Sequence, residues 1–458
     1  YIAADQSDVE NVDIAEVRAR VRNAIRTWPE HLTLALEDRH DRGRTAELTE
    51  RYANAFSSGY RAATGVDEAV DDIDALEELR DSGSRQVVLK DLVPAQPSTF
   101  QLKVFDQETR YVLSDVMPVL ENLGFRVLTA DAYDVRPEAS PVEVTVHSFI
   151  VQIPDGWDVD PEAAGHRISE AFFAIQNGWA ENLGINNLIL SAGMDWRQVA
   201  LIKAYGAYAF RIGAVSSRLG LRRPLLEQPG AARILFEVFS TLFDPKFDGN
   251  RDASVRALES AYGRILGDVR SIEDDRTLRR LMALVKATVR TNYFQAEFRQ
   301  RPEAAIGLKF DCSQIEFMPR PRPKHEVWVN SARTEGAHLR MGDVARGGLR
   351  WSDRQEDFRL EVLGLVKTQQ VKNAVIVPAG AKGAFVVSQP PADRSAWREA
   401  GVTSYRDFVG AILSITDNVV EGEVTHPADT VVRDGDDPYL VVAADKGTAT
   451  LSDTANAL

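Results

Sequence analysis

The chain has 458 residues, and at roughly 100 to 200 residues per domain this length predicts about three domains. With 44% hydrophobic and 27% charged residues, the composition excludes a disordered, collagen-like or disulfide-framework protein. The 68 acidic and 54 basic side chains leave a net charge of −14, which disfavours nucleic acid or an anionic membrane as the main partner. The single cysteine, Cys312, cannot close an intrachain disulfide, and we expect it to be a small buried side chain.

The apolar runs and the first residues of the chain bear on its cellular location. No uninterrupted apolar run approaches the ~18 to 20 residues that span a bilayer. The first residues lack the basic and apolar regions of a signal peptide, so we expect a cytoplasmic protein. Because the sequence starts without Met and stops at Leu458 inside what reads as structured sequence, we also expect a fragment of a longer polypeptide.

The first part, residues 1–85, is predicted to be helical, because its apolar residues recur at three- to four-residue spacing. The recurring positions are Ile14, Val17, Val21, Ile25, Leu48, Tyr52, Phe56 and Tyr60. The acid-rich run from Asp67 to Asp81 is interpreted as a solvated helix face or a linker.

The second part, residues 86–178, changes from a helical to a strand period. Its expected elements are a strand at Phe100–Phe105, a helix at Tyr111–Leu123, strands at Phe125–Ala130 and Val142–Ile153, and a helix at Asp160–Gly178. A strand-helix-strand-strand-helix order is typical of a small ferredoxin-like, split βαβ unit.

The third part, residues 179–300, is interpreted as a helical spacer with helices at Trp196–Arg211, Ala231–Leu242 and, broken near Asp274, Ala253–Tyr293. Residues 301–458 mix strands and helices and predict an α/β domain. Its expected strands are Glu326–Asn330, Gly336–Met341, Ala374–Val377, Ala384–Val387, after a glycine turn, and Tyr439–Ala443. Its expected helices are Arg354–Asn373 and Ser404–Val420.

Several site types are excluded by their missing motifs. The sequence has no G-x-x-x-x-G-K-[ST] phosphate loop, no H-E-x-x-H, no G-x-S-x-G and no C-x-x-C. It also lacks a G-x-G-x-x-G after a strand, so the cofactor-binding residues of a dinucleotide site are unknown. The seven histidines are scattered, and we predict no metal site.

The candidate site lies where cations stand beside glycines. Arg346 precedes two glycines, and Lys382 stands between Gly380-Ala and Gly-Ala384. Gln369 and Lys372 are three apart, so they share one face of the intervening helix. Glycines let a ligand approach the backbone, and apolar neighbours lower the pKa of a lysine by desolvating it. These parts are suited to binding a dicarboxylate and polarising a water or a carbonyl; exposed cations in glycine turns are the alternative.

Asp445 is the second candidate. It follows the apolar run Tyr439–Ala444, and a carboxylate at the end of a strand is well placed to exchange protons. The alternative is a helix cap or turn residue ahead of Gly447.

Four segments that contain these residues resemble the large-subunit class of NAD-specific glutamate dehydrogenases. They are Ala345-Arg-Gly-Gly-Leu-Arg-Trp-Ser-Asp-Arg354, Val371-Lys-Asn-Ala-Val-Ile-Val-Pro378, Gly380-Ala-Lys-Gly383 and Asp436-Asp-Pro-Tyr-Leu-Val-Val-Ala-Ala-Asp-Lys-Gly-Thr-Ala449. The strong part of the resemblance runs from Pro319 to Leu458. The upstream helices and the ferredoxin-like unit resemble the helical and ACT-like regulatory region of that class less sharply.

The resemblance implies a role for each candidate. The smaller glutamate dehydrogenases carry Lys-Gly-Gly-Leu-Arg-Phe, Phe-Lys-Asn, Gly-Gly-Lys-Gly-Gly and a strand-end Asp in the same order. By position, Arg346 is implied to hold the side-chain carboxylate of the substrate, and Lys372, helped by Gln369, its α-carboxylate. Lys382 is implied to activate water and Asp445 to shuttle protons.

Two departures from the smaller enzymes matter. Arg346 replaces a lysine, and its planar guanidinium can hold a carboxylate through two hydrogen bonds. Ala381 and Ala384 replace glycines around Lys382, so both positions need backbone angles that an alanine can adopt.

The fold class implied is multidomain α+β and α/β. Helical segments and an ACT-like unit precede the α/β substrate-binding part of the catalytic domain, and a Rossmann domain is expected beyond Leu458. The implied activity is reversible, NAD-dependent oxidative deamination of L-glutamate to 2-oxoglutarate and ammonium in amino-acid catabolism, by a homo-oligomer. A dehydrogenase for an apolar amino acid would leave Arg346 unexplained. The alternative from another class is a noncatalytic amino-acid sensor with its effector at the ACT-like region.

Overall fold

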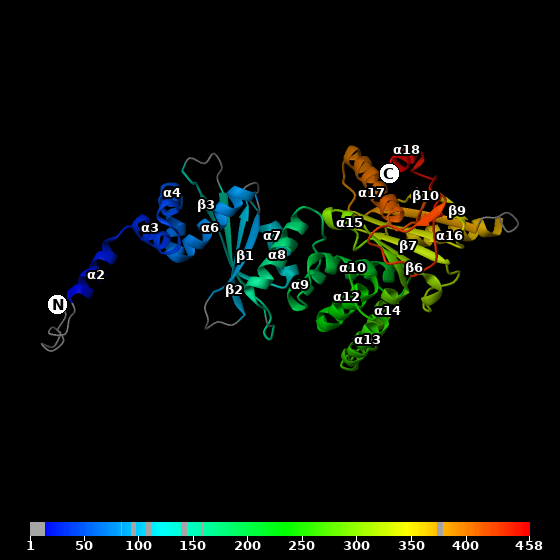
Figure 1. Ribbon diagram of the computed structural model, residues 1–458, viewed down its shortest axis with the longest axis horizontal. Helices are drawn as coiled ribbons and strands as arrows, with labels where there is room; N and C mark the ends of the chain where they lie inside the picture. The colour runs from blue at the N-terminus through cyan, green and yellow to red at the C-terminus, as the bar shows by residue number, and fades with distance from the viewer. Residues whose placement is uncertain are drawn as a thin grey trace. The chain divides into compact units, whose positions relative to one another are not determined.

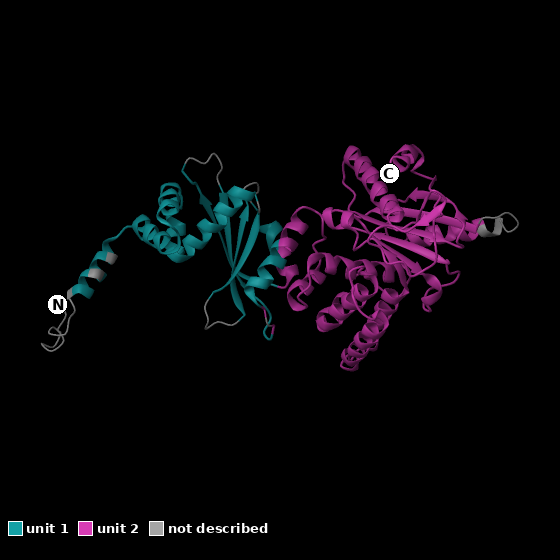
Figure 2. Cartoon of the chain, in the orientation of Figure 1, with its two compact units in different colours: residues 1–117, 125–156, 160–169 teal, residues 118–124, 157–159, 170–458 magenta. Residues whose placement is uncertain are grey.

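The computed structural model describes residues 14–83, 85–92, 98–106, 111–138, 144–157, 159–372 and 379–458, which fall into two compact units (Figure 2). Unit 1 comprises residues 1–117, 125–156 and 160–169, and unit 2 comprises residues 118–124, 157–159 and 170–458. Each helix that is described is too short or too polar to cross a bilayer. The division into four domains at residues 85, 178 and 300 stays a prediction.

Unit 1 joins a helical segment to a sheet (Figure 1). Its helices are α2 (Ile14–Ile25), α3 (Trp28–Arg39), α4 (Arg42–Tyr52), α5 (Ser58–Ala63) and α6 (Val66–Ser82). Capping side chains set several boundaries: Asp41 accepts hydrogen bonds from the first N–H groups of α4, and Ser57 accepts one in α5. Gly83 ends α6 with a φ of +67°, in the left-handed region that favours glycine.

The sheet of unit 1 is antiparallel, with the strand order β1-β2-β4-β3. Its strands are β1 (Gln86–Asp91), β2 (Thr99–Asp106), β3 (Arg126–Val135) and β4 (Val144–Gln152), with α7 (Leu113–Leu123) before β3 and α8 (Pro161–Gln176) after β4. The expected strand-helix-strand-strand-helix order is therefore confirmed for β2 to α8. The unpredicted strand β1 lies beside β2, in the place that the last strand of a ferredoxin-like unit takes, so the unit is a permuted version of that fold.

The acid-rich helix α6 is not simply a solvated face, because it buries two of its acids. Asp72 accepts hydrogen bonds from Lys103 at 2.5 Å and from the Tyr60 hydroxyl at 2.6 Å. Glu77 accepts from Arg44, Arg51 and the Tyr52 hydroxyl. The interpretation as a solvated face or linker is wrong at these positions, because a paired carboxylate can be buried beneath a helix that otherwise looks too acidic.

Unit 2 is built on an eight-stranded mixed sheet in the order β14-β10-β11-β8-β7-β6-β5, with β9 beside β11. The strands are β5 (Thr288–Thr291), β6 (Ile306–Asp311), β7 (His325–Asn330), β8 (Thr334–Arg340), β9 (Ala345–Arg346), β10 (Gly348–Trp351), β11 (Ala379–Val387) and β14 (Ala443–Ala444). A separate hairpin pairs β12 (Asn418–Val420) with β13 (Glu423–Thr425).

Helices cover both faces of this sheet (Figure 1). The helices of this unit are α9 (Leu188–Ser191), α10 (Trp196–Arg211), α11 (Arg222–Glu227), α12 (Pro229–Phe243), α13 (Arg251–Gly267), α14 (Ile272–Ala287), α15 (Ala296–Gln300), α16 (Phe358–Lys372), α17 (Arg394–Leu413) and α18 (Ser452–Asn456), and only some of them contact the sheet. On one face, Trp328 of β7 donates to the Ala204 carbonyl of α10 at 3.1 Å and stacks on Phe358 of α16. On the other face, Phe385 of β11 packs against Phe408 of α17.

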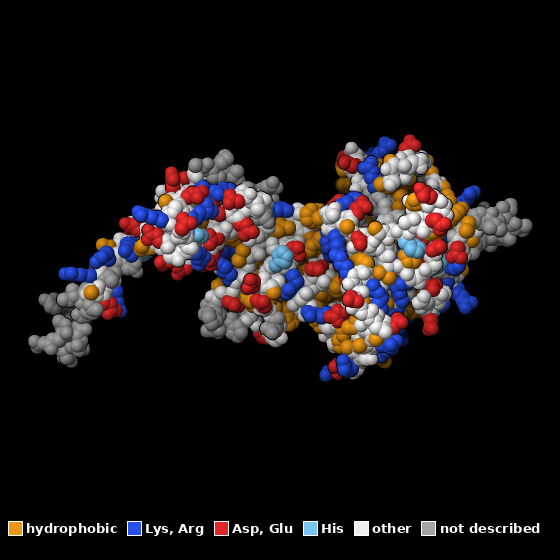
Figure 3. Space-filling view, viewed as in Figure 1, with side chains coloured by type: hydrophobic (Ala, Val, Ile, Leu, Met, Phe, Trp, Pro, Cys, Tyr) orange, Lys and Arg blue, Asp and Glu red, His pale blue; other side chains and the backbone are white. Residues whose placement is uncertain are grey.

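The helices of residues 179–300 are part of unit 2 and not a spacer, so that interpretation is wrong. Tyr208 of α10 stacks on Phe310 of β6 with ring centroids 4.3 Å apart, and its hydroxyl donates to Glu326 of β7 at 3.1 Å. Tyr208 of this helical part is thus buried against the sheet. Exposed charges of both signs are interspersed over the face of each unit that Figure 3 shows.

Three elements of the α/β part differ from their predictions. The helix expected at Ser404–Val420 begins at Arg394, where Asp393 caps it, and ends at Leu413, because the apolar residues after it belong to β12. The expected strand Tyr439–Ala443 pairs only at β14, since Leu440 and Val442 pack against the core beside α17 instead. The glycine turn around Lys382 is regular strand, because β11 pairs on both sides there. The expected strand Ala374–Val377 lies outside the described residues.

Candidate active site

Strand β11 carries Lys382 near the middle of the sheet. Residues opposite each other in paired strands, and alternate residues along a strand, share a face. Gly380 pairs with Arg346 of β9, so Arg346, Gly380 and Lys382 lie on one face. Helix α16 covers this face, because the side-chain oxygen of Gln369 comes within 3.1 Å of where a Cβ on Gly380 would be. The strand register thus places Arg346 and Lys382 on the same face, and α16 brings Gln369 to it.

Lys382 and Asp445 form the centre of the site. The Nζ atom of Lys382 donates to Oδ2 of Asp445 at 2.9 Å, although 63 residues separate them. Their side chains are 22% and 20% exposed, which leaves both within reach of a ligand. Burial tends to raise the pKa of Asp445, but hydrogen bonds from Lys382 and from the Lys446 N–H, with the charge of Arg350, hold it below its usual value. Its neighbours therefore keep Asp445 in the ionised form.

The turn that begins at Asp445 is clamped to β10. The backbone N–H of Asp445 donates to Oγ1 of Thr448 at 3.0 Å, and this hydroxyl donates to the Leu349 carbonyl at 2.7 Å. Gly447 has a φ of +83°, which favours glycine. Asp445 is thus both a turn residue and the hydrogen-bond partner of Lys382. A turn position is therefore compatible with a role in proton exchange.

Gln369 and Arg346 meet through the backbone. Nε2 of Gln369 donates to the Arg346 carbonyl at 2.9 Å, while its Oε1 is buried and has no hydrogen-bond partner among the described residues. The side chain of Arg346 is exposed, and within the described part of the chain it forms no ion pair. Lys372 ends α16, but its side chain lies outside the described residues. The free guanidinium of Arg346 is available to a carboxylate.

Arg350, Glu361 and Ser352 are site residues that the sequence analysis did not single out. Arg350 donates to Glu361 of α16 at 2.5 Å and reaches Oδ1 of Asp445 at 3.4 Å. The Ser352 hydroxyl donates to the other oxygen of Glu361 at 2.7 Å. Arg350 lies on β10 and Ser352 directly follows the strand, and their spacing of two residues in a glycine-rich, Trp-containing motif is the signal that could have identified them.

The segment before Asp445 is anchored by a buried ionic network. Oδ2 of Asp437 accepts from Lys309 at 2.6 Å and from Arg340 at 2.5 Å, and both cations are almost fully buried. Burial tends to raise the pKa of Asp437, but these two cations hold it below its usual value. Asp437 fixes one end of the segment and the turn at Asp445 fixes the other.

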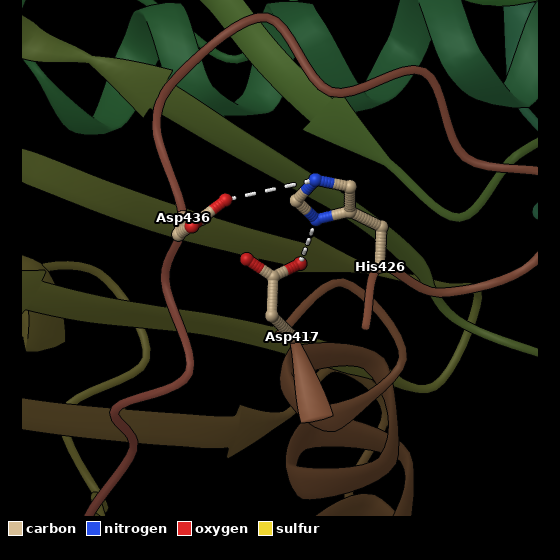
Figure 4. Close-up of side chains that lie close together, drawn as sticks. All are labelled: Asp417, His426 and Asp436. Carbon is tan, nitrogen blue, oxygen red and sulfur yellow. Dashed lines mark hydrogen bonds and ion pairs between the residues drawn. The ribbon is translucent and has the colours of Figure 1, made fainter. Parts of the chain in front are cut away.

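His426 closes the outer edge of this network (Figure 4). Its Nδ1 lies 2.8 Å from Oδ1 of Asp417, and its Nε2 lies 3.7 Å from Asp436. One ligand atom of each of the three side chains lies within 4.8 Å of the others, and in this structure the two carboxylates face opposite nitrogens of the ring. Both oxygens of Asp417 also accept from Arg290, at 2.6 and 3.0 Å. Asp417 thus links Arg290 of β5 to the segment that carries His426, and His426 lies near Asp436.

Comparisons with known proteins agree with this geometry. Residues 262–458 match the family of bacterial NAD-glutamate dehydrogenases, catalytic domain. Residues 87–164 match the glutamate dehydrogenase ACT3 domain, and residues 35–79 and 180–245 match its helical motifs 2 and 3. Among curated proteins, the NAD-specific glutamate dehydrogenase of Halomonas elongata is 41% identical over 97% of this chain, and those of Pseudomonas aeruginosa and Mycobacterium tuberculosis are 40% identical over 98% and 99%.

The chain belongs to the NAD-specific glutamate dehydrogenase family. It spans 28 to 29% of the length of these three relatives. The part that matches the glutamate dehydrogenase catalytic domain includes the whole site, from the sheet strands to Asp445. The match to the ACT3 domain covers the four-stranded sheet from Val87 on, α7 and the first residues of α8.

Proposed function

We propose that the chain forms the substrate side of the active site of an NAD-dependent glutamate dehydrogenase. The reaction converts L-glutamate, NAD and water reversibly into 2-oxoglutarate, ammonium, NADH and a proton. The observation that carries this proposal is the 2.9 Å contact between Lys382 and Asp445, on the face of the sheet to which Arg346 belongs, where the exposed Arg346 forms no ion pair with the described residues. A sensor would have no need of this lysine-carboxylate pair at a site that a ligand can reach.

Substrate binding is assigned to three side chains around Lys382. Arg346 holds the side-chain carboxylate of glutamate through two charge-assisted hydrogen bonds. Lys372 holds the α-carboxylate, with Gln369 one turn earlier as its helper. The unpartnered Oε1 of Gln369 also suits an N–H donor such as the substrate ammonium. Together these contacts fix the position of Cα, which is an orientation effect.

Proton transfer is assigned to the central pair. Hydrolysis of the imino acid needs a polarised water, and Lys382 is placed to bind that water and to stabilise the oxygen that becomes negative. Oδ2 of Asp445 accepts a proton from the water and returns it to the departing ammonia. The lowered pKa of Asp445 favours the carboxylate that the first of these transfers requires.

None of the residues to which a role is assigned above is proposed to bind NAD. The sequence has no glycine fingerprint after a strand, and every proposed role here concerns the amino-acid substrate. We assign the binding of NAD, whose nicotinamide accepts the hydride, to a Rossmann domain beyond Leu458, and the greater length of the relatives supports this assignment. Three further features stay predictions: an amino-acid effector at the ACT-like unit, self-association into a homo-oligomer, and a cytoplasmic location.

A substrate panel tests the proposal. The complete natural polypeptide is assayed for NAD reduction, followed by NADH absorbance, with L-glutamate, L-leucine and L-phenylalanine in parallel. We expect activity with glutamate alone, because only its side chain presents a carboxylate to Arg346. Activity with leucine in place of glutamate would overturn the substrate assignment, and silence with all three would overturn the dehydrogenase.

A further inference from the structure

Arg350 lies between helix α16 and the carboxylate of Asp445. Its Nη1 donates to Oε1 of Glu361 at 2.5 Å, and its Nη2 reaches Oδ1 of Asp445 at 3.4 Å. The side chains of Arg350 and Glu361 are only 17% and 14% exposed, so their contact is screened less than a surface ion pair. Burial tends to lower the pKa of Arg350, but Glu361 and Asp445 raise it above its usual value, so the cation is permanent.

Glu361 is held in place from the side opposite Arg350. Its Oε2 accepts from the Ser352 hydroxyl at 2.7 Å, and the Ser352 N–H donates to the Phe385 carbonyl of β11 at 2.9 Å. Glu361 stands in the first turn of α16, so its backbone position is set by the helix. The carboxylate of Glu361 therefore presents a fixed acceptor to Arg350.

The two oxygens of Asp445 have different partners. Oδ2 faces Lys382, and Oδ1 accepts from the Lys446 N–H at 2.7 Å and faces Arg350. Without Arg350, only the adjacent backbone N–H would hold Oδ1, and the carboxylate could rotate away from Lys382. The charge of Arg350 also helps to keep Asp445 ionised.

We propose that Arg350, fixed by Glu361, is a positioning residue that orients Asp445 so that its Oδ2 faces Lys382. The proposal rests on the function proposed above. Helix α16 then serves the reaction at both ends, because it carries Glu361 in its first turn and the substrate-binding positions 369 and 372 in its last. Arg350 contacts Asp445 and Glu361, and it acts on the substrate only through Asp445.

The test compares variants of the complete natural polypeptide in the glutamate-dependent reduction of NAD across a range of pH. In Arg350→Met we expect turnover to fall about 10- to 100-fold, while KM for glutamate changes less than about threefold. The acidic limb of the turnover profile is expected to move up by roughly one pH unit, because Asp445 loses a neighbouring cation. Arg350→Lys keeps a charge and should recover part of the rate, and Glu361→Gln should lower turnover by less than Arg350→Met, because Arg350 keeps its charge but loses its fixed partner.

Arg354→Met is the matched control. Arg354 is an arginine in the same segment, half-exposed, and it forms an ion pair with Asp357, three residues along the chain. We expect parent kinetics and an unchanged acidic limb. If Arg350→Met keeps the parent turnover and limb, or if it lowers only the melting temperature while residual activity keeps the parent profile, the positioning role is refuted. If Arg350→Met fails to fold, the same comparison is made with Arg350→Lys.

A second readout does not depend on hydride transfer. An amine-reactive acetylating reagent is applied at fixed pH, and modification of Lys382 is followed by peptide mass spectrometry. We expect Lys382 to react several-fold faster in Arg350→Met, because Asp445 no longer holds its Nζ. An equal labelling rate would refute the orientation of Asp445 by Arg350. A parent that labels as expected but oxidises no glutamate would refute the proposed function alone.

Discussion

Replacing Gly347 by alanine would disturb the backbone that carries Lys382. A Cβ at this position would lie 1.4 Å from the Ala381 carbonyl oxygen and 2.4 Å from its carbon. Carbon and oxygen in contact are normally about 3.3 Å apart or more. Strands β9 and β11 would therefore have to separate by about 2 Å at this point, and Ala381 is directly bonded to Lys382.

The size of the effect follows from this displacement. A misplacement of about 1 Å in a catalytic group can cost about 100-fold in rate, so kcat/KM of Gly347→Ala should fall at least about 100-fold. Overpacking of a well-packed region typically costs about 1–3 kcal/mol, which should appear as a lower urea midpoint. Steady-state NADH formation and urea unfolding, both on the complete natural polypeptide, measure the two effects.

Gly364→Ala is the control for this change. Gly364 is exposed within α16, and nothing lies within 4 Å of where its Cβ would be. We expect parent kinetics and an equal or higher stability, because alanine is favoured over glycine inside a helix by about 0.5–1 kcal/mol. Parent-like kcat/KM and stability in Gly347→Ala would refute the described approach of β9 to β11, and with it the position of Arg346 beside Lys382.

Three further predictions concern binding, packing and acid stability. Arg346→Ala should raise KM for glutamate about 10- to 100-fold, since a hydrogen bond to a charged group contributes about 1.5–3 kcal/mol. An unchanged KM in steady-state assays would show that Arg346 does not bind the substrate. Arg359→Met should lower the free energy of unfolding by about 3–5 kcal/mol, because the fully buried Glu326 would lose the cation that donates to both of its oxygens at 2.7 Å. A loss of less than about 1 kcal/mol in urea unfolding would contradict this pairing. Burial would raise the pKa of Asp417, but Arg290, the Asp437 N–H and His426 lower it to about 2 from 3.8. Its contribution of about 2 kcal/mol should be present above about pH 4 and be lost as the pH falls towards 2, and acid titrations in which Asp417→Asn and the parent lose stability equally would contradict this.

The sequence predicts those features that depend on local pattern. The helices at Trp196–Arg211 and near Ala231–Leu242 follow from apolar spacing, and the structure confirms them within two residues. Cys312 is buried, as its residue type suggests. The contact between Lys382 and Asp445 agrees with the roles that the resemblance implied, although it tests the proximity of these residues and not their chemistry.

Features that depend on distant partners could not be predicted in this way. Asp72 and Glu77 look solvated in sequence, because Lys103, Arg44 and Arg51 are far from them along the chain. The run before Asp445 reads as a strand, yet most of it packs beside α17 without pairing. Strand β1 was missed because its place beside β2 is set by tertiary pairing. Arg350 and Glu361 were overlooked for the same reason, since their contact joins a strand to a helix.

The most direct test of the account is the turnover of Lys382→Ala in the complete natural polypeptide. Glutamate-dependent NADH formation is measured beside the parent, with thermal unfolding of both proteins to verify that the fold survives. The account predicts that turnover falls about 10²- to 10⁴-fold while the melting temperature stays close to that of the parent, because Lys382 acts on the water and not on the fold. A near-normal rate in Lys382→Ala would contradict the account.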